Sequence, residues 1–108
     1  MDFGKYKSCI EACNVCATYC DACAVACLKE DDVKMMAECI RLDMQCAQIC
    51  RLAASLMAQG SEYASEVCRI CVDICKKCGD ECAKHDADHC QECAKACHRC
   101  AEECAAMA

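Results

Sequence analysis

The stretch CIEACNVCATYCDACAVAC, residues 9–27, decides the fold of this chain. Its cysteines follow one another at alternating intervals of four and three residues, and two later groups repeat this alternation. Positions three and four apart lie on one face of an α-helix, so each group predicts a helix that packs through a stripe of thiols. The groups are Cys9, Cys13, Cys16, Cys20, Cys23 and Cys27; Cys68, Cys71, Cys75, Cys78 and Cys82; and Cys90, Cys93, Cys97, Cys100 and Cys104.

The segment between the first two of these groups has fewer cysteines but the same register. It carries Cys39, Cys46 and Cys50. Extending their register in both directions adds Met36, Asp43, Ala53 and Met57 at the same alternating intervals. This segment is therefore predicted to be a helix of the same type, in which other side chains replace some of the thiols.

Short connections with helix-end signals separate the four segments. Capping boxes are expected at Ser8–Glu11 and Asp88–Gln91, although the first helix could begin before Ser8. The other signals are a cap at Asp31 or Asp32, a stop at Gly60 and a start at Ser61. Short connections favour antiparallel neighbours. The sequence predicts an all-α, antiparallel up-down-up-down four-helix bundle with a Cys-lined core, built as a single domain over residues 1–108.

Composition separates this chain from secreted disulfide scaffolds. It has 19 Cys, an odd number, with three Gly and no Pro. Leu, Ile, Val and Phe together number 15, so sulfur replaces the usual core filling. The start, MDFGKYKSCIEAC, lacks the apolar stretch and cleavage site of a signal peptide. Reduced thiols without an export signal predict a cytosolic protein.

Charge and hydropathy argue against two kinds of partner, nucleic acids and membranes. The net charge is −6, with acidic and basic residues interspersed, whereas binding to nucleic acid needs clustered Lys and Arg. No apolar run is expected to reach the roughly 20 residues that span a bilayer. We therefore expect neither nucleic acid nor a membrane as a partner.

Thiols in this arrangement favour copper(I). Burial as a small hydrophobe would explain a few cysteines, but not nineteen in stripes. Neighbours on one stripe have Cβ atoms about 5–6 Å apart, too far for a disulfide. A metal ion can close that gap, and soft thiolates at low coordination number select Cu(I) over tetrahedral zinc. Bridging thiolates predict about one Cu(I) per Cys, with thiols that are protonated before loading.

The two ends of the predicted bundle differ. The end with the first and third connections collects Cys27, Met35, Met36, Cys82, His85, His89 and Cys90, and we expect copper to pass through it, although the histidines could equally be exposed loop residues. The other end collects Phe3, Tyr6, Leu56, Met57, Tyr63 and Val67, an apolar plug. His98 lies off the stripe and is expected on the surface.

Two features stay open at this point. Asp43 is the carboxylate in core register and could ligate a metal, accept a hydrogen bond from a thiol, or be exposed by a small register shift. Second apolar stripes could flank the core or form oligomer contacts. These stripes are Val15 and Tyr19; Leu42, Ile49 and Leu56; and Val67, Ile70 and Ile74.

The repeated CxxxCxxC runs, CIRLDMQCAQIC at 39–50 and CGDECAKHDADHCQECAKAC at 78–97 closely resemble the bacterial copper storage proteins of the cytosolic branch. The resemblance covers essentially the whole chain. It implies a four-helix bundle that forms a homotetramer and holds many Cu(I) ions on its cysteines. In the family His, Met or Asp can supplement the thiols near one end, and here Asp43, His85 and His89 fall in the matching segments, with Met36 as a further candidate. A copper chaperone or a small-thiol carrier is the expected exchange partner.

Three rival functions fit less well. An iron–sulfur carrier needs loops around its cluster and usually a Pro after the last ligand. A metallothionein-like zinc buffer lacks heptads and folds only around metal. A thiol oxidoreductase needs strands and a nucleophile with a distinct partner. The sequence therefore predicts a binding protein and not an enzyme.

Overall fold

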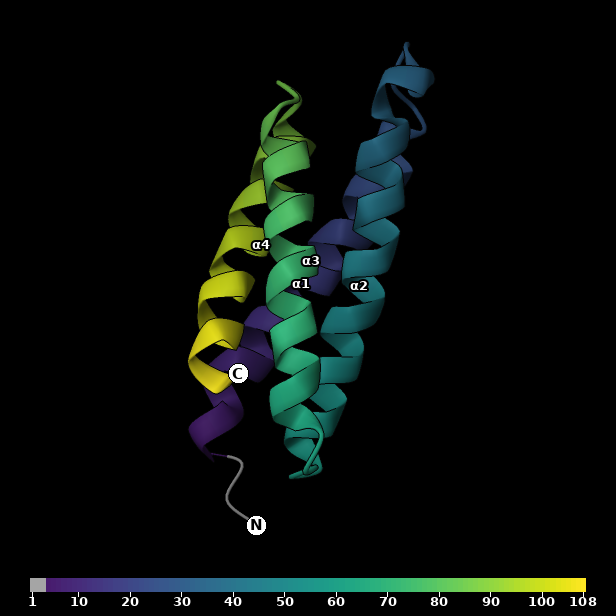
Figure 1. The fold of residues 1–108 in the computed structure, drawn as a ribbon. Helices are drawn as coiled ribbons and strands as arrows, with labels where there is room; N and C mark the ends of the chain where they lie inside the picture. Colours follow the sequence, from purple (N-terminus) through teal and green to yellow (C-terminus); the bar gives the residue numbers. More distant parts are fainter. Residues whose placement is uncertain (1–3) are drawn as a thin grey trace.

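The computed structural model describes residues 4–108 as four long helices (Figure 1). They are α1 (Lys7–Cys27), α2 (Ala37–Ala58), α3 (Ala64–Ala83) and α4 (Asp88–Met107). Two short 3-10 helices, η1 (Gly4–Tyr6) and η2 (Val33–Met36), lead into α1 and α2. Over this described range no strand is present, so the predicted all-α class is confirmed.

The helices form an elongated bundle of 48 × 17 × 17 Å. Each helix packs against two others, in the pairs α1–α2, α2–α3, α3–α4 and α4–α1. The connections α1–α2 and α3–α4 lie at one end of the bundle, and the α2–α3 connection lies at the other end with both termini (Figure 1). This arrangement is the predicted up-down-up-down topology.

The core consists of thiols and alanines. All nineteen cysteines are free and buried, each with at most 1% of its surface exposed. Alanines such as Ala12, Ala17, Ala47 and Ala101 fill most of the other buried positions, and Met36, Leu42, Asp43 and Met57 are buried beside them. The predicted Cys-lined core is confirmed.

The predicted capping box at Ser8 is wrong, and the alternative that the first helix begins before Ser8 is confirmed. η1 runs directly into α1, which begins at Lys7, so Ser8 already lies inside the helix. Tyr6 occupies the cap position without a side-chain hydrogen bond. The Ser8 hydroxyl instead donates to Glu103 of α4 over 2.8 Å and ties α1 to the last helix.

The predicted capping box at Asp88 is also wrong. α4 begins at Asp88 itself, and its cap residue, Ala87, makes no side-chain hydrogen bond. Gln91 turns back instead, and its Nε2 donates to the carbonyl oxygens of Ala83 (3.2 Å) and His85 (2.6 Å). This contact satisfies free carbonyls after α3 and fixes the connection that carries His85.

The remaining end signals lie close to their expected places. Asp32 accepts a hydrogen bond from the Met35 amide over 3.3 Å, but it caps η2, which precedes α2. Gly60 follows α2 with φ of 67°, a left-handed conformation that favours glycine, and so confirms the predicted stop. The Ser61 hydroxyl accepts from the Tyr63 amide in the turn before α3.

One segment, Gly4–Cys27, is long and apolar enough to cross a membrane by length and composition, with a mean hydropathy of 1.2. The expectation that no segment reaches this length is therefore wrong, because Cys and Ala both count as apolar. In the bundle the cysteines of this segment face the other helices. The core helix of a soluble protein passes the same test, so this feature alone is weak evidence for a membrane span.

Candidate metal centre

The cysteines of α1 and α4 face each other in antiparallel register. Each step of three or four residues along α1 is matched by an equal step back along α4. The facing sulfur pairs are Cys9–Cys104 (3.5 Å), Cys13–Cys100 (3.6 Å), Cys16–Cys97 (3.6 Å), Cys20–Cys93 (3.7 Å) and Cys23–Cys90 (3.9 Å).

The α2 and α3 side chains face each other in the same way. The facing pairs are Cys50–Cys71 (3.8 Å), Cys46–Cys75 (3.6 Å), Asp43–Cys78 (3.2 Å) and Cys39–Cys82 (3.4 Å). One further step of this register places Ala53 opposite Cys68. Sulfur pairs such as Cys16–Cys46 (3.6 Å) and Cys50–Cys100 (3.7 Å) join the two halves.

Together these pairs stack five layers of four side chains along the bundle axis. From the end near the termini they are Cys9, Ala53, Cys68 and Cys104; Cys13, Cys50, Cys71 and Cys100; Cys16, Cys46, Cys75 and Cys97; Cys20, Asp43, Cys78 and Cys93; and Cys23, Cys39, Cys82 and Cys90. The remaining thiol, Cys27, lies beyond the last layer.

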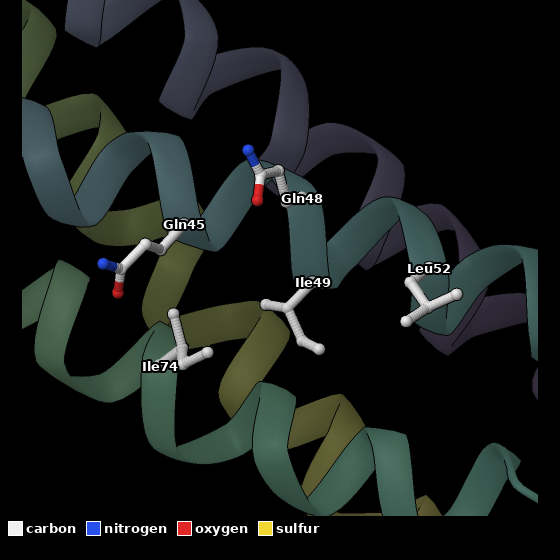
Figure 2. Close-up of a pocket in the computed structure, with 5 residues that line it drawn as sticks. All are labelled: Gln45, Gln48, Ile49, Leu52 and Ile74. Carbon is white, nitrogen blue, oxygen red and sulfur yellow. The ribbon is translucent and has the colours of Figure 1, made fainter.

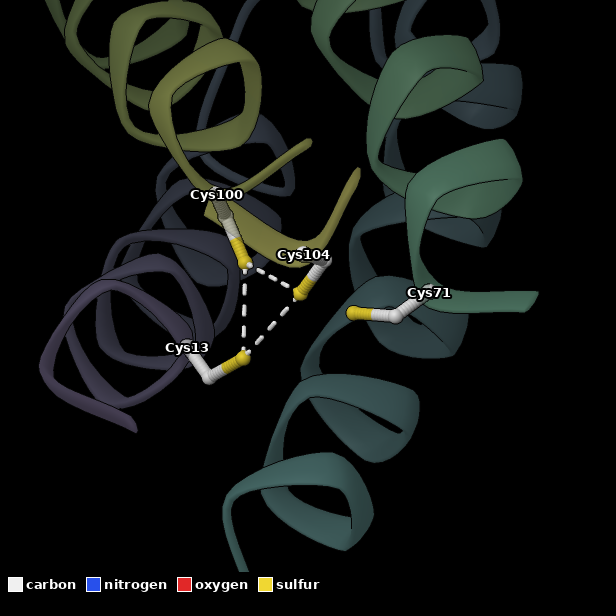
Figure 3. A group of neighbouring side chains, drawn as sticks. All are labelled: Cys13, Cys71, Cys100 and Cys104. Carbon is white, nitrogen blue, oxygen red and sulfur yellow. Dashed lines mark hydrogen bonds between the residues drawn. The ribbon is translucent and has the colours of Figure 1, made fainter. Parts of the chain in front are cut away.

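Sulfurs of neighbouring layers also approach one another. Figure 3 shows Cys13, Cys100 and Cys104 in mutual contact with the sulfur of Cys71 pointing toward them, and these four sulfurs all lie within 4.8 Å of one another. The Cys13–Cys104 distance is 3.6 Å and the Cys100–Cys104 distance is 3.9 Å. The layers therefore form one continuous column of sulfur.

The sulfur spacing suits bridging by metal ions. The contacts between sulfurs run from 3.4 to 4.0 Å, within helices and between them. Two bonds of about 2.3 Å that meet at a trigonal ion place their sulfurs about 4 Å apart. A bonded disulfide would need about 2.05 Å. Ions can therefore link different helices, which the spacing along single helices could not predict.

Asp43 is fully buried in the fourth layer, with 0% of its surface exposed. Thiols surround its carboxyl group: Cys78, Cys93 and Cys82 donate to Oδ1 over 3.2, 3.4 and 3.5 Å, and Cys39 donates to Oδ2 over 3.8 Å. Of the alternatives left open by the sequence, the structure excludes the exposed one.

Burial raises the pKa of three groups in this core, Asp43, Cys90 and Cys27, and so favours their neutral forms. Desolvation, followed by the nearby Cys93 and Cys78, raises the pKa of Asp43 to about 10. Desolvation also raises the pKa of Cys90 to about 11 and raises the pKa of Cys27 above its usual value. A metal-free core of protonated thiols and a protonated carboxyl group avoids uncompensated buried charge.

His89 lies against the open end of the sulfur column. Its Nδ1 lies 3.4 Å from the sulfur of Cys23 and 3.5 Å from the sulfur of Cys90. Its Nε2 is buried and has no hydrogen-bond partner, although a carboxylate oxygen of Glu30 lies 3.7 Å away. The imidazole therefore continues the column of soft ligands toward the surface. We call this end, with Cys27, Met36, His85 and His89, the mouth.

His85 is held differently from His89. Its Nε2 lies 3.0 Å from Glu81 Oε2, and both side chains are largely buried. It borders a surface cavity of about 400 Å³, whose lining includes Met35 and Met36. Met36 is buried and Met35 is 62% exposed, so two sulfurs and an imidazole meet there. The structure thus brings together the predicted mouth residues and adds Glu81 as a partner of His85.

The opposite, closed end is apolar, with one correction. Met57 is fully buried, and Tyr6, Leu56, Val67 and Met107 pack against the core cluster. Tyr63 does not join them, because it is 59% exposed in the turn before α3. Phe3, also predicted here, lies outside the described residues. The sequence analysis missed Met107, which also packs against the core cluster.

His98 lies on the surface as expected. It is 44% exposed, and its Nε2 lies 3.0 Å from Asp80. The sequence analysis missed Glu30 and Glu81 at the mouth and assigned Gln91 to a capping box. Glu81 lies four residues before His85, which follows the end of α3, and this spacing could have suggested the pair.

The fold and the sulfur column define a class of protein: a four-helix bundle whose interior can hold many soft metal ions on thiolates. The family model for the copper storage proteins matches residues 3–108, and the chain belongs to this family. Family membership confirms the prediction of a storage protein and not an enzyme. Curated proteins gave no match.

Solved structures of copper storage proteins agree with this assignment. The Cu(I)-bound copper storage protein BsCsp3 is 50% identical, with a TM-score of 0.92, over 96% of this chain and 98% of that chain. Apo-Csp3 from Bacillus subtilis is 49% identical, with a TM-score of 0.88, over 94% and 97%. A cytosolic copper storage protein from Streptomyces lividans with five coppers is 39% identical, with a TM-score of 0.93, over 98% and 93%.

Proposed function

We propose that this chain, as one domain over residues 1–108, stores many Cu(I) ions in the cytosol at a load of about one ion per cysteine. The observation that carries the proposal is the column of nineteen buried thiols, eighteen of which have a neighbouring sulfur 3.4–4.0 Å away. Each ion can be shared by sulfurs from two or three helices. A single metal site would need only a few of these thiols. The large number of thiols therefore favours the storage of many ions.

Charge balance supports this load. Each thiol that binds loses a proton, and a monovalent ion replaces the lost charge, so the dry core stays neutral. The soft thiolate is the ligand that Cu(I) prefers. Divalent ions at the same number would leave a large positive charge in the core. The core therefore suits the binding of a soft monovalent ion such as Cu(I).

The cysteines would be the principal ligands, and four other side chains would supplement them. His85, His89 and Met36 offer nitrogen and sulfur at the mouth, and Asp43 offers oxygen in the fourth layer. Copper would pass through the mouth, since His89 Nδ1 already lies within 3.5 Å of the first two sulfurs. Among residues 4–108, the closed end offers no histidine beside the sulfur column.

A cytosolic location and an exchange partner complete the proposal. Nineteen free thiols persist best in a reducing compartment, and one of the similar solved structures is described as cytosolic. Free Cu(I) needs a carrier, so a copper chaperone or a small-thiol carrier would deliver and collect ions at the mouth. Neither a nucleic acid nor a membrane is needed for this function.

The outer apolar stripes support assembly as a homotetramer. Figure 2 shows Gln45, Gln48, Ile49, Leu52 and Ile74 around a shallow cavity of about 340 Å³ between α2 and α3. Leu52 of α2 and Ile70 of α3 are each about half exposed to solvent. Val15 and Tyr19 form a second exposed apolar stripe, on α1. Apolar patches on two faces can join copies of the chain. Sedimentation of the wild type beside Leu52→Glu would test this, and a monomeric wild type would contradict it.

Anaerobic titration with Cu(I) against a chromophoric competing ligand tests the proposed storage. We expect saturation near one ion per cysteine. A variant with Ser at Cys16, Cys46, Cys75 and Cys97 should keep its helical circular dichroism and lose about four ions, one central layer. Saturation at one or two ions in the wild type would reject the proposal.

A further inference from the structure

The fourth layer differs from its neighbours because its donors mix oxygen with sulfur. The layers on either side are complete sets of four thiols, whereas here α2 contributes the Asp43 carboxyl group. The residue is fully buried. All four of its hydrogen-bond donors are thiols, so its contacts include no cationic group that could balance an ionised carboxylate.

The separations between Asp43 Oδ1 and its three nearest sulfurs, two in this layer and one in the next, fit a tetrahedral ion. Bonds of about 2.3 Å to sulfur and about 2.1 Å to oxygen place the oxygen and sulfur donors of a tetrahedron roughly 3.6 Å apart. Asp43 Oδ1 lies 3.2, 3.4 and 3.5 Å from the sulfurs of Cys78, Cys93 and Cys82. All three oxygen–sulfur separations therefore lie within a few tenths of an ångström of the value for a tetrahedral ion.

The chemistry of this donor set lowers the advantage that Cu(I) has over a divalent cation in the all-thiol layers. A carboxylate oxygen is a harder ligand than a thiolate and binds Cu(I) more weakly. Zinc accepts sulfur and carboxylate oxygen in one tetrahedral site. The exchange of one thiol for a carboxyl group thus lowers the preference for copper at this layer.

The geometry points to a second kind of metal site in this chain: one divalent cation of the zinc class, bound by Asp43, Cys78, Cys82 and Cys93 when the bundle holds no copper. The ion would cross-link α2, α3 and α4 in the copper-free protein, and its positive charge would stabilise the ionised carboxylate and thiolates that bind it. This inference concerns the copper-free protein and does not depend on the proposed storage of Cu(I).

Cobalt(II) is the probe that tests this site, because tetrahedral thiolate coordination gives it intense d–d and charge-transfer bands. Anaerobic titration of the copper-free protein should give tetrahedral bands that saturate at one Co²⁺ per chain, and Zn²⁺ should remove them. Asp43→Asn and Cys78→Ser should each weaken Co²⁺ binding by about tenfold or more. The matched control is Cys71→Ser, two layers away, which should bind Co²⁺ as the wild type does.

Two results would overturn the inference. One is octahedral Co²⁺ without thiolate bands; the other is a Cys71→Ser variant that is weakened as much as Asp43→Asn, which would place the ion in an all-thiol layer. Asp43→Cys, which restores a fourth strong donor, should keep a tetrahedral spectrum with a stronger charge-transfer band. Cu(I) capacity measured on the same variants separates a failure of this site from a failure of storage.

Discussion

The two ends of the bundle are built from different side chains around the same column of sulfur. At the closed end Met57 is fully buried and Tyr6 and Met107 pack against the core. At the mouth His89 contacts the first sulfurs directly, and the neighbouring Met35 is mostly exposed. Apolar side chains close one end, whereas at the other end thioether, imidazole and thiol groups lie between the surface and the sulfur column.

This difference explains how one core can be shielded from solvent and still take up copper. The thiols are shielded from solvent along their whole length, so exchange depends on the few groups at the mouth. The closed end contributes stability instead, because its large apolar side chains are removed from water. Changes at the closed end should alter folding, and changes at the mouth should alter the kinetics of copper exchange.

The largest effect is expected from truncation at the closed end. Met57→Ala should lower the free energy of unfolding of the copper-free protein by about 2–5 kcal/mol, because it leaves a cavity in the sealed end. Met35→Ala at the mouth should change it by less than about 0.5 kcal/mol. Urea denaturation under reducing conditions measures both. Equal losses in the two variants would contradict the division between the ends.

The next effect concerns Asp43, between the two ends. The folded protein keeps this carboxyl protonated up to a pKa of about 10, whereas the unfolded chain loses the proton near the usual value of 3.8. The folded state thus binds more protons, and stability should fall as pH rises from about 5 to 8, by up to about 1.4 kcal/mol per pH unit.

Denaturation of the copper-free protein at several pH values measures this slope. Asp43→Asn should remove most of it, whereas Asp73→Asn, at an exposed position of α3, should retain it. A wild type whose stability is flat over this pH range would show that Asp43 is not protonated in the folded state.

At the mouth the expected change is kinetic. His89→Ala should slow the uptake of Cu(I) from a chelator complex by about tenfold, because the first nitrogen ligand beside Cys23 and Cys90 is lost. Most of the copper capacity should remain, since the sulfur column is intact. His98→Ala, on the outer surface, is the matched control and should load at the wild-type rate. Stopped-flow absorbance of thiolate–copper bands follows both reactions.

The smallest effect is expected in the layer nearest the closed end, which lacks a fourth thiol. Ala53→Cys should complete this layer beside Cys9, Cys68 and Cys104 and raise the Cu(I) capacity by about one ion. Ala58→Cys, at an exposed position, should not add a bridged ion. Equal gains in both variants would mean that thiols bind copper irrespective of their place in the column.

The sequence predicted the fold because its signal is repeated in every helix. Alternating intervals fixed the buried face of α1, α3 and α4, and extending the register of Cys39, Cys46 and Cys50 fixed that of α2. The mouth was also predictable, since connection lengths decide which helix ends meet. These conclusions need the geometry of single helices and short connections.

Features that depend on contacts between helices could not be predicted in the same way. The pairing of Cys39 with Cys82, and the four thiols around Asp43, follow from the relative heights of neighbouring helices. The capping boxes failed for a local reason, because Ser8 and Asp88 already lie inside their helices. Gln91 was free to bind carbonyls at the end of α3, a contact between two helices.

Anomalous diffraction at the copper edge, from crystals of the protein loaded anaerobically with Cu(I), would show directly whether the sulfur column binds the copper ions. We predict a row of anomalous peaks along the bundle axis, in and between the sulfur layers, with each ion bonded to sulfurs of at least one helix pair. Peaks confined to the outer surface, or a core free of copper with its sulfurs joined as disulfides, would contradict the account.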